Sequence, residues 1–196
     1  VRIVRRADSD LRAITGISVE HCIGDVRDPK SLRKAMRGCD TVFHTAAIVT
    51  FASRKKEEQY EVNVLGTRNV VEACLSSGTE RLIFTSSIVA LGHPGQRELA
   101  TEQTAYNRGM KSGYKLSKYL AEKEVLAGVE RGLDAVIANP SVVIGERDIH
   151  MHGGQLLTAA RKGILPFYRD GRMNVAYVGD VVRGHISAAL KGRKGE

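Results

Sequence analysis

The sequence predicts an α/β protein built on a doubly wound parallel sheet. Short apolar runs alternate with segments of helical period, and turn or capping residues stand between them. Strands are expected at residues 2–5, 18–23, 41–45, 81–86, 135–138 and 174–178. Helices are expected at residues 11–14, 29–38, 56–76, 113–131, 155–162 and 180–191. In such sheets ligands bind beyond the carboxyl ends of the strands, so the residues just after each strand are of most interest.

Local signals set the ends of several elements. Asp28 followed by Pro29 is typical of a helix start, with a capping carboxylate and proline at the first helical position. Gly38 is expected to end that helix, and Gly78 is expected to end the long helix at residues 56–76. The polar stretch at 92–113 shows no dominant period and is expected to be a loop.

The composition is that of an ordinary globular domain. The chain has 196 residues, of which 42% are hydrophobic and 27% charged, with a net charge of +8. The basic residues are scattered among acidic ones, which argues against a nucleic-acid partner and fits an anionic cofactor. No apolar run reaches the length of about 18 residues that a membrane span needs, and residues 1–6 lack the core of a signal peptide. We therefore expect a cytoplasmic protein without a membrane partner.

The three cysteines, Cys22, Cys39 and Cys74, are odd in number and widely spaced. This pattern favours reduced thiols over disulfides or a zinc site. His150 and His152 stand two residues apart in a predicted loop without carboxylates nearby, which gives no ligand set. No metal is expected.

The segment at 113–124 combines a helical pattern with acid–base chemistry. Tyr114 and Lys118 are i and i+4, which places a phenol and an ammonium one turn apart on one helix face. A free tyrosine has a pKa of about 10, and an ammonium ~5 Å away favours the phenolate by roughly two pKa units. An isolated Tyr-x-x-x-Lys is most often a half-buried aromatic beside a solvated lysine, so the rest of the chain has to decide.

Several motifs, taken in order, resemble those of the short-chain dehydrogenase/reductases. Within that family they resemble the extended branch of NAD-dependent epimerases and dehydratases and of dihydroflavonol-reductase-like enzymes. The segments that match are Gly24-Asp25-Val26-Arg27-Asp28, Val42-Phe43-His44-Thr45-Ala46-Ala47, Val62-Asn63-Val64-Leu65-Gly66-Thr67-Arg68-Asn69, Thr85-Ser86-Ser87, Tyr114-Lys115-Leu116-Ser117-Lys118 and Asn139-Pro140-Ser141-Val142-Val143-Ile144-Gly145.

The resemblance implies a single NAD(P)-binding, Rossmann-like domain over residues 1–196, with the start of a substrate-binding lobe at about 146–196. The family's first strand and glycine-rich phosphate loop are lacking, so the domain is expected to be incomplete. In the classical strand order that first strand lies between the strands at 2–5 and 41–45. Because neighbouring strands sit about 4.8 Å apart, these two should be separated by roughly twice that distance, with unpaired backbone groups along a slot.

The resemblance also implies catalytic roles for four residues. Ser87 would donate a hydrogen bond to the substrate carbonyl, and Tyr114 would give or take the proton. Lys118 would hold the phenolate and bind ribose hydroxyls, and Asn63 would support Lys118 through water. Ser86 is the rival of Ser87, which we prefer because it stands directly before the apolar run that follows the strand.

Ten residues would bind the cofactor: Arg5, Asp25, Val26, Thr45, Ala46, Ala47, Tyr114, Lys118, Pro140 and Val143. NAD enzymes usually carry a carboxylate where Arg5 stands, whereas an arginine suits the 2′-phosphate of NADP. We therefore expect NADP(H), with NAD as the alternative.

Three functions remain open. The first is an NADP(H)-dependent oxidoreductase that interconverts a carbonyl and a secondary alcohol by hydride transfer with a Ser/Tyr/Lys proton relay; Asn139 before Pro140 favours this reductase-like branch. The alternative is an NAD-dependent sugar-nucleotide epimerase or dehydratase with the same residues. The third is a non-catalytic cofactor-sensing protein, which the complete set of Ser87, Tyr114 and Lys118 disfavours. The partner is accordingly a small carbonyl compound or a sugar nucleotide, and a homodimer is compatible with the resemblance.

Overall fold

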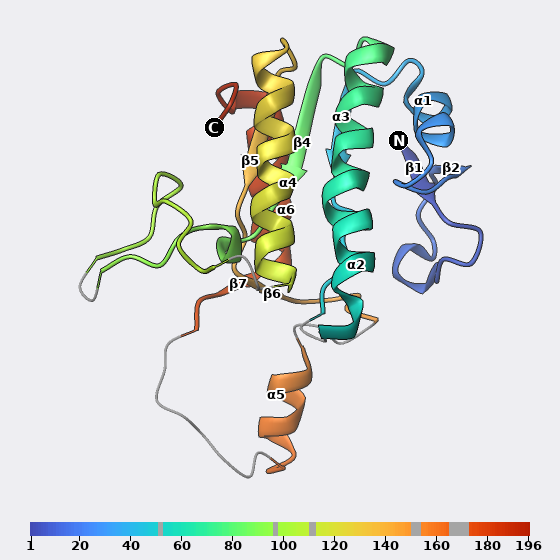
Figure 1. Ribbon diagram of the computed structural model, residues 1–196. Helices are drawn as coiled ribbons and strands as arrows, with labels where there is room; N and C mark the ends of the chain where they lie inside the picture. Colours follow the sequence, from blue (N-terminus) through green and yellow to red (C-terminus); the bar gives the residue numbers. More distant parts are fainter. Residues whose placement is uncertain (51–52, 96–97, 110–112, 150–153, 165–172) are drawn as a thin grey trace.

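The computed structural model describes residues 1–50, 53–95, 98–109, 113–149, 154–164 and 173–196. Its strands pair in parallel throughout and form three small sheets. The strands are β1 (Arg2–Arg5) with β2 (Glu20–Ile23), β3 (Thr41–His44) with β4 (Arg81–Thr85) and β5 (Ala135–Ala138), and β6 (Val142–Ile144) with β7 (Val175–Tyr177). The sheet of β3, β4 and β5 is the centre of the molecule (Figure 1).

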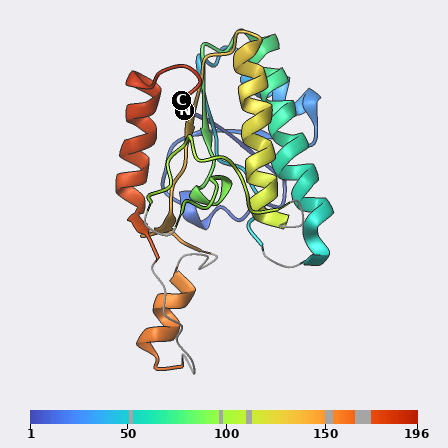
Figure 2. The same cartoon turned by 60° about the vertical axis from the view of Figure 1, so that its left-hand side comes forward.

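Helices cover both faces of the central sheet. The helices are α1 (Pro29–Met36), α2 (Lys56–Gln59), α3 (Gly66–Ser77), α4 (Gly113–Glu130), α5 (Gly154–Arg161) and α6 (Val178–Lys191). Short 3₁₀ turns are η1 (Arg12–Ile14), η2 (Ser53–Lys55) and η4 (Ile88–Ala90), and η3 (Tyr60–Leu65) is a π-helical segment. α3 and α4 lie on one face and α6 on the other (Figure 2). This two-sided cover is the predicted doubly wound arrangement.

The expected caps are in place. The Asp28 carboxylate accepts a hydrogen bond from the Lys30 backbone N–H at 3.0 Å, and Pro29 opens α1. Gly78 ends α3 in the left-handed conformation, with φ of 72°, which glycine adopts without a steric penalty.

The core lies between β4 and the helices α3 and α4. Leu82 and Phe84 of β4 are at most 1% exposed and pack in one cluster with Val71 of α3. Gly128 lets α4 approach α3, because a Cβ there would lie 2.6 Å from Val71 Cγ1. This packing fixes α4 against the sheet, and with α4 it fixes the residues that α4 carries.

The sheet is interrupted between β1 and β3. These strands belong to separate sheets, and a cavity of about 930 Å³ lies between them, lined by residues of both. We call it the β1–β3 cavity. The prediction that these two strands are not directly paired is confirmed, and side chains at the interruption are left partly open, with Val4 41% and Phe43 45% exposed.

Two local features differ from expectation. β6 was expected to be part of a loop, because a three-residue apolar run does not identify a strand; its pairing with β7, about 30 residues later, creates it. The helix expected at 56–76 is continuous but contains the π-helical segment η3 in its middle. Among the described residues, no helix has the length and apolar character that crossing a membrane requires.

Candidate active site

Two of the predicted catalytic residues meet beyond the carboxyl end of β4. Ser87 stands two residues after the end of β4 and caps η4, where its hydroxyl accepts a hydrogen bond from the Val89 N–H at 3.4 Å. Tyr114 stands in the first turn of α4, and its phenol is hydrogen-bonded to Ser87. The two side chains to which the resemblance assigns a shared substrate carbonyl therefore lie together. We call Asn63, Ser87, Tyr114 and Lys118 the catalytic cluster.

Lys118 is buried beneath this pair. Its side chain is 2% exposed, its ammonium donates to the Thr85 carbonyl at 2.8 Å, and Nζ lies 4.4 Å from the centre of the Phe84 ring. Burial lowers the pKa of Lys118 to about 8, and the carboxylate of Glu122, one turn further along α4, opposes that shift. Lys118 is thus still mainly charged at pH 7.

The expected lowering of the tyrosine pKa is wrong for this structure. Burial raises the pKa of Tyr114, and the hydrogen bond from Ser87 only partly offsets it. The physical reason is the orientation of the Lys118 side chain, because its ammonium donates a hydrogen bond to the Thr85 carbonyl of β4. The i, i+4 spacing predicted that Tyr114 and Lys118 share a helix face, but it did not predict the orientation of the lysine side chain.

Asn63 ties the loop after β3 to α4. It is 1% exposed, and its amide nitrogen donates to the Ile48 carbonyl at 3.0 Å and to Ser117 Oγ at 2.9 Å. Its amide oxygen accepts from the Ile48 N–H at 2.7 Å. Both amide hydrogens are therefore used within the protein, so any water on the way to Lys118 would have to bind the amide oxygen.

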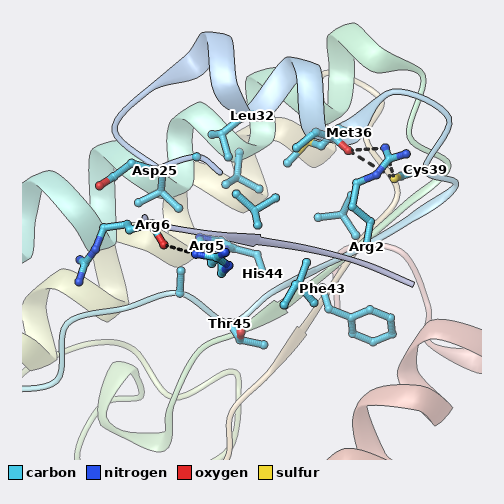
Figure 3. Close-up of a pocket in the computed structure, with 18 of the residues that line it drawn as sticks. Arg2, Arg5, Arg6, Asp25, Leu32, Met36, Cys39, Phe43, His44 and Thr45 are labelled. Carbon is cyan, nitrogen blue, oxygen red and sulfur yellow. Dashed lines mark hydrogen bonds between the residues drawn. The ribbon is translucent and has the colours of Figure 1, made fainter. Parts of the chain in front are cut away.

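The β1–β3 cavity collects six predicted cofactor residues, which come from the ends of three strands: Arg5, Asp25, Val26, Thr45, Ala46 and Ala47. Arg5, Arg6 and Asp25 lie toward one end of this cavity, and Arg2 and Cys39 toward the other (Figure 3). The cavity also extends to Gly38, Cys39 and Asp40 before β3, so its volume of about 930 Å³ is that of the whole slot between the two strands. Pro140 and Val143 do not line it; they lie beyond β5 and in β6, and the Pro140 carbonyl accepts from the Ile88 N–H at 3.1 Å.

Two arginines, Arg5 and Arg6, line this cavity where β1 ends. Arg5 is held by hydrogen bonds from Nε to His21 Nδ1 and from one terminal nitrogen to the Arg6 carbonyl, both at 3.1 Å. The carboxylate of Asp25 is already paired with Arg27, whose guanidinium donates to it at 2.8 Å, and this hydrogen bond lowers the pKa of Asp25. Arg6 is paired with Asp8, whose Oδ1 accepts from its Nε at 3.2 Å, whereas the two hydrogen bonds of Arg5 given above go to a histidine nitrogen and a carbonyl. Arg5 therefore fits a dinucleotide phosphate.

Sequence reasoning missed three polar side chains near the cluster, of which His44 is buried and Thr85 and Glu122 are half-buried. His44 is 4% exposed, its Nε2 lies 2.9 Å from Thr67 Oγ1, and burial lowers its pKa to about 3. Thr85, whose carbonyl receives Lys118, also hydrogen-bonds His185 of α6 through its hydroxyl at 2.9 Å. Glu122 carried a readable signal, because it stands four residues after Lys118 on the same helix face.

No group of three or more side chains able to hold a metal occurs among the described residues. His150 and His152 lie outside them. The three cysteines are unpaired, and burial raises the pKa of the Cys74 thiol to about 12.

The parallel strands with helices on both faces define an α/β protein of the Rossmann-like class. The profile of the 3-beta hydroxysteroid dehydrogenase/isomerase family matches residues 2–194, and the chain belongs to that family. The resemblance to NAD(P)-dependent epimerases, dehydratases and reductases is therefore confirmed at the level of the family.

Known proteins agree with this assignment. A Synechocystis sp. protein with the provisional name dihydroflavonol 4-reductase is 34% identical over 197 residues, which cover 98% of this chain and 57% of that protein. The crystal structure of gox2253 superposes with a TM-score of 0.93 at 37% identity and covers 100% of this chain and 60% of the other. A Streptomyces venezuelae dTDP-glucose 4,6-dehydratase, solved with NAD and DAU bound, has a TM-score of 0.80 at 25% identity, over 94% of this chain and 58% of its own. The chain thus spans about three fifths of the length of these proteins.

Proposed function

We propose that the whole protein is an NADP(H)-dependent oxidoreductase that interconverts a carbonyl and a secondary alcohol. The observation that carries the proposal is the meeting of Ser87, Tyr114 and Lys118 at the carboxyl end of β4. The β1–β3 cavity opens at the same edge of the parallel strands, where this fold binds dinucleotides. Residues 1–196 form one incomplete dinucleotide-binding domain in this proposal, with the start of a substrate lobe from about residue 146.

Each residue of the cluster has one task. Ser87 donates a hydrogen bond to the carbonyl oxygen as negative charge develops there, and the phenol of Tyr114 gives or takes the proton. Lys118, charged and desolvated, stabilises negative charge on the phenol oxygen during transfer. A nicotinamide cofactor, when bound, supplies or accepts the hydride. Asn63 holds α4 against the loop after β3, which keeps Tyr114 and Lys118 in register with β4.

Arg5 favours NADP(H) over NAD in this proposal. It stands at the carboxyl end of β1, and its side chain lines the cavity with Arg6. A guanidinium fork binds a 2′-phosphate through charge-assisted hydrogen bonds that a ribose hydroxyl cannot offer.

A sugar-nucleotide epimerase or dehydratase is the second candidate, since the same serine, tyrosine and lysine serve those reactions. The dTDP-glucose dehydratase noted above supports it, as does MoeE5, solved in complex with UDP-glucose and NAD. Asn139 before Pro140 favours the reductase.

Net cofactor consumption separates the two candidates. The whole protein would be incubated with NADPH and, in turn, a dihydroflavonol, a 3-ketosteroid and a 2-alkyl-3-oxoalkanoate, the substrate classes that the names of relatives suggest. A reductase oxidises one NADPH per carbonyl reduced, followed at 340 nm. Conversion of UDP-glucose or dTDP-glucose without net change in cofactor would favour the second candidate, and failure to bind either NADPH or NADH would overturn both.

A further inference from the structure

A half-buried amide joins the catalytic serine to the helix that carries the catalytic lysine. Asn139 stands directly after β5, and its Nδ2 donates to the Ser87 carbonyl at 3.2 Å and to Glu122 Oε1 at 2.6 Å. An amide nitrogen has two hydrogens, and both are used here. Asn139 therefore connects the end of β4, the end of β5 and the middle of α4.

The Ser87 carbonyl is a branching point of the local backbone. It accepts the Ala90 N–H at 2.9 Å, which closes the turn η4, in addition to the Asn139 amide. The side-chain hydroxyl of the same residue hydrogen-bonds Tyr114. Restraining this carbonyl restrains the direction of the hydroxyl, because only the side-chain torsion then stays free.

Glu122 adds charge to this geometry. It is half-buried and one helical turn after Lys118, whose charged form its carboxylate favours. Burial raises the pKa of Glu122, while hydrogen bonds from neighbours such as Asn139 and the charge of Lys118 act in the opposite direction. The carboxylate thus faces Lys118 on one side and receives the Asn139 amide on the other.

We propose that Glu122 and Asn139 are positioning residues that hold Ser87 and Lys118 in place for proton transfer, an inference that rests on the proposed function. Neither residue needs to touch the substrate. Asn139 fixes the serine through its backbone, and Glu122 fixes Asn139 and supports the ammonium of Lys118.

The test compares Asn139→Ala, Glu122→Ala and Glu122→Gln in the whole protein. The matched control is Glu124→Gln, on the same helix, where the carboxylate pairs with the exposed Arg68. The readouts are kcat and KM with NADPH and the carbonyl compound reduced fastest in the panel above, and amide hydrogen exchange at Ala90.

We expect Asn139→Ala to lower kcat by about 10- to 100-fold, the scale of a misplacement of about 1 Å, with KM for NADPH within roughly twofold. Ala90 exchange should rise about tenfold, as the closing of η4 loses a restraint.

Glu122→Gln keeps an oxygen that accepts from Asn139 and is the variant least prone to misfold. It should keep wild-type exchange at Ala90 and lower kcat less than Glu122→Ala does. Wild-type kcat in Asn139→Ala, or a loss of kcat equalled by Glu124→Gln, would overturn the proposal. Tyr114→Phe in the same series distinguishes failure of the proposed function from failure of the positioning role. If Tyr114→Phe retains turnover, the proposed function is wrong. If Tyr114→Phe abolishes turnover while the Asn139 and Glu122 variants keep it, only the positioning role is wrong.

Discussion

The catalytic cluster and the β1–β3 cavity differ in how completely this chain packs them. Lys118 and Asn63 are 2% and 1% exposed, and their polar groups are hydrogen-bonded to the sheet and to the loop after β3. The cavity instead leaves about 930 Å³ open between two strands that are not paired with each other. The proton-transfer geometry is thus set by the central sheet and its helices, whereas the cofactor side depends on what occupies the cavity.

The largest expected effect is on chemistry in the packed region. Tyr114→Phe in the whole protein should lower kcat by about 10²- to 10⁴-fold, the usual contribution of a positioned acid or base, because the lost hydroxyl acts mainly in the transition state. NADPH affinity, measured by fluorescence titration, should stay within a few-fold. Near-normal turnover would show that another group transfers the proton.

A pair of phenylalanines on neighbouring strands contrasts the two regions directly. Phe84 of β4 is 1% exposed and Phe43 of β3 is 45% exposed. Phe84→Ala should reduce the free energy of unfolding by about 3–5 kcal/mol, because it opens a hole in the core and removes the ring beneath Lys118. Phe43→Ala should cost less than about 1 kcal/mol. Urea unfolding of both variants measures the two changes in unfolding free energy. Equal losses of unfolding free energy would mean that the face of β3 carrying Phe43 is covered in the whole protein.

Acid should destabilise the packed region through His44. Its folded-state pKa of about 3 lies below the ordinary value of 6.5, so the unfolded chain binds the proton first. The stability is complete above about pH 6.5 and is lost as the pH falls toward 3, on the order of 5 kcal/mol in total. His44→Gln, which keeps a partner for Thr67, should flatten the fall in unfolding free energy between pH 7 and 4.

The smallest effect is expected in the cavity. Arg5→Ala should weaken NADPH by roughly 10- to 100-fold, the value of one charge-assisted hydrogen bond, and NADH by much less. Parallel titrations with both cofactors measure the ratio. An equal loss for the two would shift the preference to Arg6 or remove it from this strand end.

Much of the fold could be predicted because its signals are local. Asp28 with Pro29 and Gly78 marked helix ends that the structure reproduces, and the alternation of apolar runs with helical segments gave the order of elements. β6 could not be predicted, since its three residues become a strand only by pairing with β7. The π-helical segment η3 could not be predicted either, because nothing in the local pattern distinguishes it from the α-helix around it.

The sequence by itself determined the family, the order of the motifs and which side chains share a helix face, because these depend on spacing along one chain. Only the tertiary structure decided that the Lys118 ammonium points to the Thr85 carbonyl, that burial raises the pKa of Tyr114, and that Asn139 bridges Ser87 and Glu122. Those properties arise between residues from different elements, where distance and desolvation set the energy, and no spacing rule contains them.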